Sequence, residues 1–559
     1  MPVVEVSLWD LERLVGRSLS KADIEELLPR LKCEVEEVGD SAVAYEATHD
    51  RPDLYSAELL SVYLRGLLEV ELGLPRFKSG GVVGEARIEG PSYRPYAYFA
   101  VVRGVSLDDE AIRQLMQLQE KIHLTYGRDR RKVSIGLYDL RGVEFPIRYV
   151  GVKPEAVKFK PLGFTVEMTP LQVLREHPKG VAYRHLVEGH EMLPLIVDAE
   201  GKVVSFPPIT NSEDYRVTES TRDVLIDVTS TDPEAGRRIV TLMASAVATR
   251  GGTIYQVRNV SGALSEVSPR LEPDHVTYNV SLNRQLLGLD LGPRETQELL
   301  ARMRMEAVAI GGDELRVAYP YFRVDILHPV DIAEEVAMAY GYERIEPQYM
   351  PPLHPGREHG LEVFSRAVRE AMIGMGFIEV NNYIMTSREL MFTMMGLEVG
   401  DIVEVENPKH EMYHALRTWI IPQLLATLSN SKHAGYPQRI FEVGDVVIPD
   451  PSRENRARDE RHLAFAIAGK GVTLTDGLAT LKTLCALFKA GHELRALEHK
   501  SFISGRAARV LSECGELGIV GEIHPQVLVN FNLAVPVVAG ELDVERLKGC
   551  YEKWKEGYS

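Results

Sequence analysis

Apolar and polar positions recur in the same order at two places along the chain. The first copy opens with the strand-like run Val6-Ser7-Leu8, and the second opens with Val280-Ser281-Leu282. Beyond these openings an offset of 272 keeps identical residues in register: Gly16 and Gly288, Glu26-Leu27-Leu28 and Glu298-Leu299-Leu300, Arg30 and Arg302, Glu34 and Glu306, Arg51 and Arg323, Asp53 and Asp325. Each copy predicts a strand, a helix with apolar residues at i, i+3 and i+4, a strand and a second helix. The chain therefore contains two related small α/β modules.

The region between the copies has a different pattern. It predicts a helix over 109–126, then a basic run at 128–132, then an alternating strand over 133–139. The Pro207-Pro208 pair breaks regular structure after another strand. In the segment 223–229 polar residues alternate with valine and isoleucine, which predicts a strand with one mostly polar face. Two interpretations stay open for that face: solvent exposure, which the pattern favours, or the wall of a pocket that holds water and a ligand amine.

The last third of the chain reads as a separate domain. Four prolines in the segment 347–355 are typical of a linker. After it we expect a helix over 361–375, ended by Gly376, and a strand over 377–383. The predicted domains are 1–84, the first module; 85–268, a middle domain; 269–346, the second module; and 347–559, a C-terminal domain. With 559 residues, several hydrophobic cores are expected.

Composition narrows the class of protein. The net charge of −17 argues against a protein that coats itself with nucleic acid, because such proteins are usually basic. The four cysteines form no C-x-x-C pair and indicate neither a zinc site nor a disulfide framework, which fits a reducing cytosol. No apolar run approaches 18 residues, and the first six residues resemble a strand rather than a signal peptide. We therefore expect a cytoplasmic protein with no membrane span.

Only the second module carries a group of carboxylates. Asp331, Glu334 and Glu335 fall on one helix face at i, i+3 and i+4, and Asp325 lies just before that helix. Four carboxylates suit a hard cation such as Mg²⁺. An acidic helix N-terminus that complements the helix dipole gives the same pattern, and spacing alone favours that second interpretation.

Several motifs occur in a characteristic order. His49-Asp50-Arg51-Pro52-Asp53-Leu54 lies in the first module, and D-I-x-x-x-x-D-I-x-E-E-V-x-x-x-Y-G-Y spans 325–342. The middle domain has F-P-P-I-x-N at 206–211 and D-V-T-x-T-D at 227–232. The C-terminal domain has N-P at 407–408, L-R-T at 416–418 and R-I-F-E-x-G at 439–444. Throughout its length the chain resembles the β subunits of archaeal and eukaryotic phenylalanyl-tRNA synthetases.

This resemblance implies a fold and a division of labour. The fold would be multidomain α+β: duplicated modules flank an editing domain, and a degenerate class II synthetase-like domain with an antiparallel sheet follows. The chain would be one subunit of phenylalanine–tRNA ligase, joined to an α subunit in an (αβ)₂ heterotetramer that binds tRNA(Phe) and ATP. The α subunit would hold the synthetic site, because the segment 518–525 of this chain has no arginine for ATP. Arg417 and Arg439 are then fold or interface residues.

The resemblance also implies site residues. Mg²⁺ would be bound by Asp325, Asp331, Glu334 and Glu335, which reverses the preference from spacing alone. Hydrolysis of mischarged Tyr-tRNA(Phe) would use Asp227, Thr229 and Ser205, in a pocket completed by the substrate-binding residues Leu195, Pro208 and Asn211. The sequence shows no local Ser-His-Asp or Cys-His pairing, so we expect a positioned water and no covalent intermediate. The basic run at 128–132 is either a tRNA contact or a solvated turn.

Other functions remain to be weighed. Thr210 and Ser212 depart from the isoleucine and glycine that the family motif leads us to expect, which supports a non-catalytic structural and tRNA-docking subunit with a degenerate editing site. A free-standing nucleic-acid-binding protein is disfavoured by the acidic charge. An autonomous synthetase is disfavoured by the missing arginine.

Overall fold

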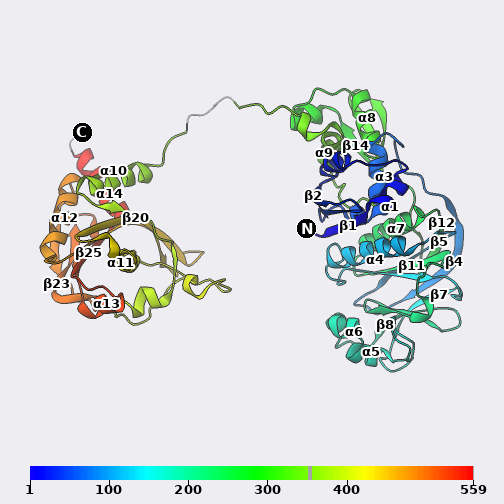
Figure 1. Ribbon diagram of the computed structural model, residues 1–559, viewed down its shortest axis with the longest axis horizontal. Coiled ribbons are helices and arrows are strands. Elements are labelled where there is room, and N and C mark those ends of the chain that lie inside the picture. The colour runs from blue at the N-terminus through cyan, green and yellow to red at the C-terminus, as the bar shows by residue number, and fades with distance from the viewer. Residues whose placement is uncertain (351–355, 558–559) are drawn as a thin grey trace. The chain divides into compact units, whose positions relative to one another are not determined.

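Figure 1 shows the computed structural model, which describes residues 1–350 and 356–557. The chain divides into two compact units, Met1–Tyr349 and Met350–Ser559. Most of the predicted proline-rich linker, residues 351–355, lies outside the described residues. Within the described ranges, no helix combines the length and the apolar composition that a membrane span requires.

The two repeat copies share one topology. In the first, three antiparallel strands pair in the order β1-β3-β2, and in the second the order is β14-β16-β15. The bounds in the first copy are β1 Val3–Ser7, α1 Leu8–Val15, α2 Lys21–Leu27, β2 Cys33–Val38, β3 Ala42–Ala47 and α3 Ala57–Leu67. Those in the second are β14 Asp274–Asn279, α8 Pro293–Arg302, β15 Glu306–Gly311, β16 Glu314–Tyr319 and α9 Pro329–Tyr340. The equal strand orders confirm the duplication.

The predicted order of elements within each copy is incomplete. Where the sequence pattern predicts one strand between two helices, each copy has a hairpin, β2–β3 or β15–β16. In the second copy the hairpin turns through Gly311 and Gly312, both with positive φ, a conformation that glycine adopts without strain. In place of a second copy of α1 stands a single π-helical turn, Asn283–Leu287. The short hairpins escape the pattern because each strand is only six residues long.

The middle region is built on a ten-stranded sheet. Its order is β10-β9-β8-β7-β4-β12-β5-β11-β6, with β13 paired to β12. The bounds are β4 Ser79–Glu89, β5 Tyr96–Arg103, β6 Val133–Asp139, β7 Ile147–Val152, β8 Leu193–Val197, β9 Val203–Phe206, β10 Thr210–Asn211, β11 Asp223–Ser230, β12 Thr253–Ser261 and β13 Leu264–Ser268. The helices are α4 Asp109–Leu124, α5 Pro170–Glu176, α6 Pro178–Tyr183 and α7 Pro233–Ala248. The predicted helix 109–126 and strand 133–139 are thus present.

The sheet separates two hydrophobic cores. Val224, Ile226 and Val228 of β11 pack with α4 and α7 in a core that continues into both repeat copies. Figure 1 shows α4 and α7 between this sheet and the first copy. Leu225 of β11 packs on the opposite face with Phe99. The expectation that the polar face of 223–229 is solvent-exposed is wrong, because that face of β11 is covered and buries Asp227 and Thr229 together with Leu225.

The second unit contains a mostly antiparallel sheet of seven strands. Its order is β17-β20-β21-β25-β24-β23-β22, and β17 alone is parallel to its neighbour. The strands are β17 Ile378–Glu379, β20 Gln438–Pro449, β21 Ala457–Ala468, β22 Glu493–Ala496, β23 Phe502–Ser512, β24 Gly515–Ile523 and β25 Val537–Asp543, with a separate pair, β18 Met385–Thr386 and β19 Ala415–Leu416. Helices α10 Gly360–Gly374, α12 Leu474–Leu487 and α14 Val544–Glu556 pack on one face, and α11 Ile421–Asn430 and α13 Pro525–Asn530 on the other.

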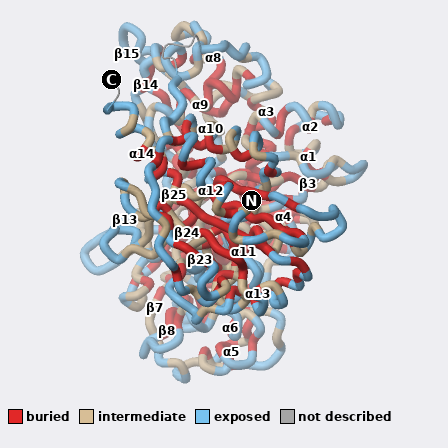
Figure 2. The backbone as a smooth tube through the Cα atoms, turned by 90° about the vertical axis from the view of Figure 1, so that its left-hand side faces the viewer, coloured by how far each residue is buried: buried red, intermediate tan, exposed pale blue. Residues whose placement is uncertain are grey.

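In this unit the predicted helix is present, and the predicted strand is longer than the observed one. The helix predicted over 361–375 is α10, and Gly376 follows it with a φ of +83°. The strand predicted over 377–383 is regular only at Ile378–Glu379. In Figure 2, α9 carries a run of buried residues, whereas β13, which pairs with β12 at the margin of its sheet, is largely exposed.

Candidate functional site

A cavity of about 300 Å³ lies at the β6 edge of the ten-stranded sheet. Strands β6 and β11, helices α4 and α6 and the segment 205–211 supply its walls. The lining residues are Met116, Gln119, Glu120, Arg130, Ser134, Ile135, Tyr138, Leu162, Lys179, Ser205, Pro207, Pro208, Ile209, Thr210, Asn211 and Asp227. Apolar walls with a few convergent polar groups are typical of a ligand site.

Strand alternation brings Asp227 into this cavity. Successive side chains of β11 point to opposite faces, so Asp227 faces away from the helix-covered core that holds Ile226 and Val228. In the register of β11 with β6, Asp227 lies opposite Gly136. A Cβ at Gly136 would collide with the Tyr138 hydroxyl and with Asp227 Oδ1. Glycine at this position therefore makes the room that the acidic group occupies.

The Asp227 carboxylate is fully buried and poised to ionise near neutrality. Burial raises its pKa to about 7, while a hydrogen bond from Tyr138 and the charge of Arg94 favour the ionised form. The Tyr138 hydroxyl donates a short hydrogen bond to Asp227 Oδ1. Burial also raises the pKa of Tyr138 well above its ordinary value, and the Asp227 charge adds to that shift, so the phenol keeps its proton.

Arg94 fixes the end of β11 beside this pair. Its Nε donates to Thr229 Oγ1 and its Nη2 to the Thr229 carbonyl, both at 2.8 Å. Its Nη1 donates to the Arg130 carbonyl at 3.0 Å, and its own carbonyl accepts the Tyr149 hydroxyl. The Arg94 guanidinium thus donates its hydrogen bonds to backbone and hydroxyl oxygens. It acts on Asp227 through its charge and not through a hydrogen bond.

One residue of the basic run, Arg130, lines the cavity. Arg128, Asp129 and Arg130 are three successive residues with positive φ, a conformation that L-residues adopt at a cost of roughly 1–2 kcal/mol each. Arg130 is buried, donates to the carbonyls of Pro208 and Ile209, and pairs with Glu120 at 3.0 Å. Neither predicted alternative describes Arg130, which forms a wall of the cavity, whereas Arg128 and Arg131 are exposed. Strained backbone that persists is typical of functional sites.

The structure brings four of the six predicted editing residues together. Ser205, Pro208, Asn211 and Asp227 line the cavity. Thr229 lies two residues beyond Asp227 on the same face of β11 and is fully buried against Arg94. Leu195 packs behind the wall with Phe206 and Ile209 and does not line it.

Sequence reasoning missed Tyr138 and Arg94. Tyr138 lies two residues after Gly136 in a strand whose alternation was recognised, and a tyrosine on the same face as a glycine was the available signal. Arg94 lies in a loop with no periodicity, so no local pattern marked it. Nearby, Asn211 donates to the Leu137 carbonyl at 3.3 Å, and its Oδ1 lies 3.4 Å from the Tyr138 hydroxyl.

The four carboxylates expected to bind Mg²⁺ already have partners within the chain. Arg323 donates to both oxygens of Asp325, at 2.7 and 2.6 Å, and also to Glu335. Asp331 Oδ2 accepts the backbone N–H groups of Leu327 and His328, each at 2.7 Å, and so caps its own helix α9. Glu334 pairs with Lys32 of the first repeat copy at 2.7 Å.

These residues do not fit a shared cation. Although burial raises the pKa of Asp325, the charge of Arg323 outweighs that effect and lowers it to about 2. Glu335 Oε2 is buried without a partner, but so are the Nη1 atoms of Arg51 and Arg323 in the same cluster, which favours an anion over a cation there. Within the described ranges, the side chains close enough to share a metal are Glu513, Cys514 and Cys550, and none of the four is among them.

Glu335 instead joins the two repeat copies. Arg51 and Asp53 of the first copy pair as Arg323 and Asp325 do in the second, and Arg51 Nη1 lies 3.9 Å from Glu335 Oε1. With the offset of 272, Glu335 occupies the position of Tyr63, whose ring packs against the Arg51 guanidinium. We call Arg51, Asp53, Arg323, Asp325 and Glu335 the junction cluster. Within this cluster, ion pairs between side chains connect the two copies without a metal ion.

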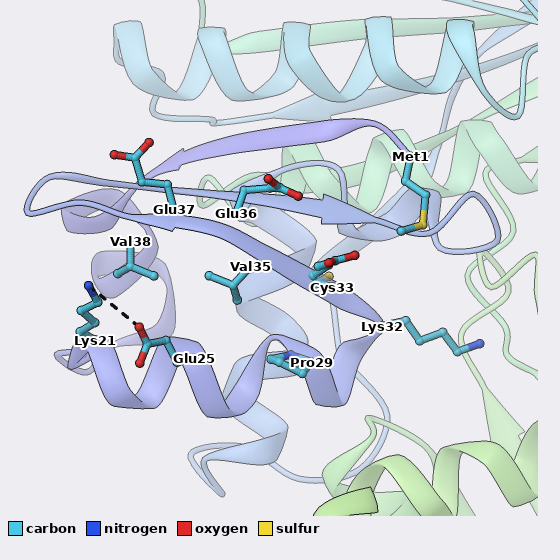
Figure 3. A pocket seen from close by; sticks show the side chains of 11 residues that line it. Met1, Lys21, Glu25, Pro29, Lys32, Cys33, Val35, Glu36, Glu37 and Val38 are labelled. Atoms are coloured by element: carbon cyan, nitrogen blue, oxygen red, sulfur yellow. Dashed lines mark ion pairs between the residues drawn. The ribbon is translucent and has the colours of Figure 1, made fainter. Parts of the chain in front are cut away.

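A larger hollow in the first copy carries no comparable chemistry. It has a volume of about 940 Å³ and lies along α2 and β2. Figure 3 shows Lys21 and Glu25 paired on the helix, and Lys32 extending away from the other labelled side chains. Lys32 contacts Asp50 and Glu334 instead. The hollow therefore gathers no convergent polar groups.

The second unit offers no free arginine at the position of its L-R-T motif. Arg417 is buried, donates to Glu442 at 2.6 Å and to Gln423 at 2.8 Å, and its Nε donates to the Asp445 carbonyl. Arg439 is exposed and lies 5.8 Å from the Phe377 ring. Arg417 thus uses its Nε and Nη1 hydrogens within the fold, which favours a structural role for this side chain.

Comparison with known proteins identifies the family. Residues 347–544 match the model of the phenylalanyl tRNA synthetase beta chain CLM domain, and residues 276–342 match the tRNA synthetase B5 domain. The phenylalanine–tRNA ligase β subunit of Thermofilum pendens is 70% identical over 551 residues, with 99% of each chain covered. The chain belongs to the phenylalanine–tRNA ligase β subunits. It is accordingly part of a heteromeric aminoacyl-tRNA synthetase, a ligase of protein biosynthesis.

More distant β subunits agree. That of Pyrococcus abyssi is 41% identical, with 97% of this chain and 99% of that one covered. A crystal structure of an N-terminal fragment of the phenylalanyl-tRNA synthetase β subunit from Pyrococcus horikoshii is 39% identical, with a TM-score of 0.58, and covers 61% of this chain and all of the fragment. The likeness supports the multidomain fold with several sheets.

Proposed function

We propose that this β subunit hydrolyses mischarged Tyr-tRNA(Phe) in the cavity around Asp227. The observation that carries the proposal is a fully buried carboxylate, with a pKa raised by burial to about 7, on the wall of a cavity of about 300 Å³. A buried acid of this kind costs stability, and perturbed groups of this kind cluster at functional sites. The middle domain is then an editing domain.

The chemistry requires such a second site. Tyrosine differs from phenylalanine by one hydroxyl, and an apolar pocket built for phenylalanine rejects such an isostere only about 100-fold. A hydrolytic site that hydrogen-bonds the hydroxyl selects in the opposite sense. Phenylalanine in that site leaves buried polar groups unpaired, at a cost of about 1–3 kcal/mol per group.

The residues of the cavity suggest how hydrolysis proceeds. Asp227 and Ser205 hold the hydroxyl or the free amine of the aminoacyl group, and Pro208 and Asn211 shape the wall. Thr229 is buried next to the cavity, where its hydroxyl accepts the Nε–H of Arg94, so it contributes by holding Arg94 in place. His123 is unsuited to act as a base: burial lowers its pKa to about 4, and its Nε2 accepts the Ile135 N–H. Water therefore attacks the ester carbonyl directly, and its position is the main contribution of the protein.

Synthesis belongs to the partner in this proposal. The α subunit charges tRNA(Phe) with phenylalanine, using ATP and Mg²⁺, in an (αβ)₂ heterotetramer that works in the cytoplasm. This division of labour is supported by the second unit, where the Arg417 side chain forms an ion pair with Glu442. The second unit is then a degenerate class II synthetase domain that packs against α and serves assembly.

The test is hydrolysis of preformed Tyr-tRNA(Phe) by the chain copurified with its α partner. We expect fast deacylation that Asp227→Ala removes and that an exposed control, Asp459→Ala, retains. Thr229→Val tests whether the Arg94 contact beside the cavity is needed for hydrolysis. If Asp227→Ala and Thr229→Val both deacylate at the parental rate, the assignment is wrong.

The second candidate function is a structural and tRNA-docking subunit with a degenerate editing site. It is favoured by Ser212, whose buried hydroxyl has no hydrogen-bond partner, and by Thr210, both at altered motif positions. Absence of Tyr-tRNA(Phe) hydrolysis together with normal charging of phenylalanine would establish this function instead.

A further inference from the structure

We propose that Tyr138 is a positioning residue of the editing cavity, which holds the Asp227 carboxylate by one oxygen and leaves the other for the aminoacyl group. The inference rests on the proposed editing function and deepens it. It is carried by the hydrogen-bond geometry around Asp227, by the cavity and by the strand register of Gly136.

The first step is the count of donors at Asp227. Tyr138 donates to Oδ1, and among the described residues no donor reaches Oδ2. Since Asp227 lines the cavity, Oδ2 is the acceptor left for a ligand. A buried carboxylate strongly favours additional donors. The tyrosine phenol or the α-ammonium of a mischarged residue is a donor of the required kind.

The second step is that no cation competes with Tyr138. Arg94 directs its hydrogens to Thr229 and to the Arg130 carbonyl. Arg130 and Lys179 both pair with Glu120, at 3.0 and 3.1 Å, on the α4 side of the cavity. Tyr138 is thus the single direct hydrogen-bond partner of Asp227 among the described residues.

The remaining titratable groups near the pair are neutral or engaged. His123 of α4 is held neutral by burial, which lowers its pKa to about 4. Tyr149 of β7 donates its hydroxyl to the Arg94 carbonyl, and burial raises its pKa. Glu120 is neutralised by its two cations. None of these groups supplies a proton to Asp227 in the range around neutral pH.

The third step is that the sheet holds the pair rigidly. Tyr138 and Asp227 come from neighbouring strands, and Gly136 provides the space in which the hydroxyl meets the carboxylate. Asn211 Oδ1 lies 3.4 Å from the same hydroxyl. A site built on strands in this way keeps its geometry better than one built on loops.

The consequence is a predictable pH profile. The Tyr138 hydrogen bond favours ionised Asp227, so it lowers a pKa that burial raises. Hydrolysis that needs the carboxylate rises with pH through that pKa. We call this rising part of the pH profile its limb. In Tyr138→Phe the limb moves to higher pH, by about one unit or more, because a hydrogen bond to a charged group is worth roughly 1.5–3 kcal/mol.

The experiment measures deacylation of Tyr-tRNA(Phe) from pH 5.5 to 9 by the complex with its α partner, after subtraction of spontaneous ester hydrolysis. For Tyr138→Phe we expect a several-fold loss at pH 7 that is restored near pH 9. The matched control is Tyr45→Phe, a buried tyrosine of the first repeat copy that donates to the Leu54 carbonyl. Its profile should coincide with the parental one.

A second variant keeps the volume of the side chain. Incorporation of a difluorotyrosine at position 138 makes the hydroxyl a stronger donor, so the limb should move to lower pH than in the parent. If the parent hydrolyses Tyr-tRNA(Phe) and neither substitution moves the limb, Tyr138 has no positioning role. If the parent itself does not hydrolyse it, the editing function fails, which is a separate result.

Discussion

The buried carboxylate of Asp227 and the carboxylates of the junction cluster differ in the partners that the fold gives them. Asp227 has one neutral donor, Tyr138, and faces a cavity. In the junction cluster Arg323 supplies hydrogen bonds to both Asp325 and Glu335. The first carboxylate has its pKa raised to about 7, and Asp325 has its pKa lowered to about 2.

The difference shows which buried acid is available for chemistry. A carboxylate that an internal guanidinium has already neutralised stays ionised and has little left to bind. A carboxylate that lacks such a partner costs stability and keeps an acceptor free. The duplication sharpens this point, because Arg51–Asp53 and Arg323–Asp325 repeat the same pair in both copies. A repeated pair is a feature of the module rather than of a metal site.

The largest expected effect comes from breaking the junction cluster. Arg323→Met leaves Asp325 and Glu335 buried without their cation, which should cost about 3–5 kcal/mol of the free energy of unfolding. Chemical denaturation of the chain checks this value. The control is Arg294→Met, an exposed residue of α8 paired only with Glu298, which should change stability by less than about 1 kcal/mol. Equal effects of the two substitutions would contradict the assignment.

The next effect has the opposite sign and depends on pH. The folded pKa of Asp227, about 7, exceeds the value near 3.8 of an unperturbed aspartate, so the folded state holds the extra proton between these values. Stability then falls as pH rises through that window. Asp227→Asn removes the penalty and should stabilise the chain at pH 8 by up to about 4 kcal/mol, and by much less near pH 4.5.

Melting curves of the parent and of Asp227→Asn at both pH values measure this difference. Asp459→Asn, a substitution of an exposed residue of β21, serves as the control. A gain that is equal at pH 4.5 and pH 8 would show that the effect is packing rather than ionisation.

A smaller effect distinguishes a helix cap from a metal ligand. Asp331 accepts two backbone N–H groups at the start of α9, so Asp331→Ala should lower the free energy of unfolding by about 1 kcal/mol, with or without Mg²⁺. Denaturation in the presence of Mg²⁺ and of a chelator provides the comparison. A loss that appears only with Mg²⁺ would restore the metal interpretation.

The last prediction is that Mg²⁺ has no effect on the stability of the chain. A cation bound only to the folded state raises stability by about 2.7 kcal/mol at a concentration 100 times its dissociation constant. Because the four carboxylates are engaged within the chain, the melting temperature of the isolated chain should be the same in Mg²⁺ and in chelator. A clear rise with Mg²⁺, lost in Glu334→Gln, would show that Lys32 gives way to a cation.

Local patterns predicted much of the fold. The offset of 272 revealed the duplication, and the periods of α4, β6 and α10 gave elements close to those observed. The hairpins of the repeat copies and the short β17 were not predictable in the same way, because a few residues carry too little periodicity. Exposure of the polar face of β11 was predicted wrongly, since alternation alone does not show whether other parts of the chain cover that face.

The sequence by itself determined the family and the two repeats, because motifs and periodicity are local properties of the chain. Only the tertiary structure decided how the acids are used. Arg51 meets Glu335 across the two copies, and Tyr138 meets Asp227 across two strands. The hydrogen bond that favours ionised Asp227 comes from a residue distant in sequence, and so does the cation that pairs with Glu334. Spacing along the chain therefore cannot separate a ligand from a structural ion pair.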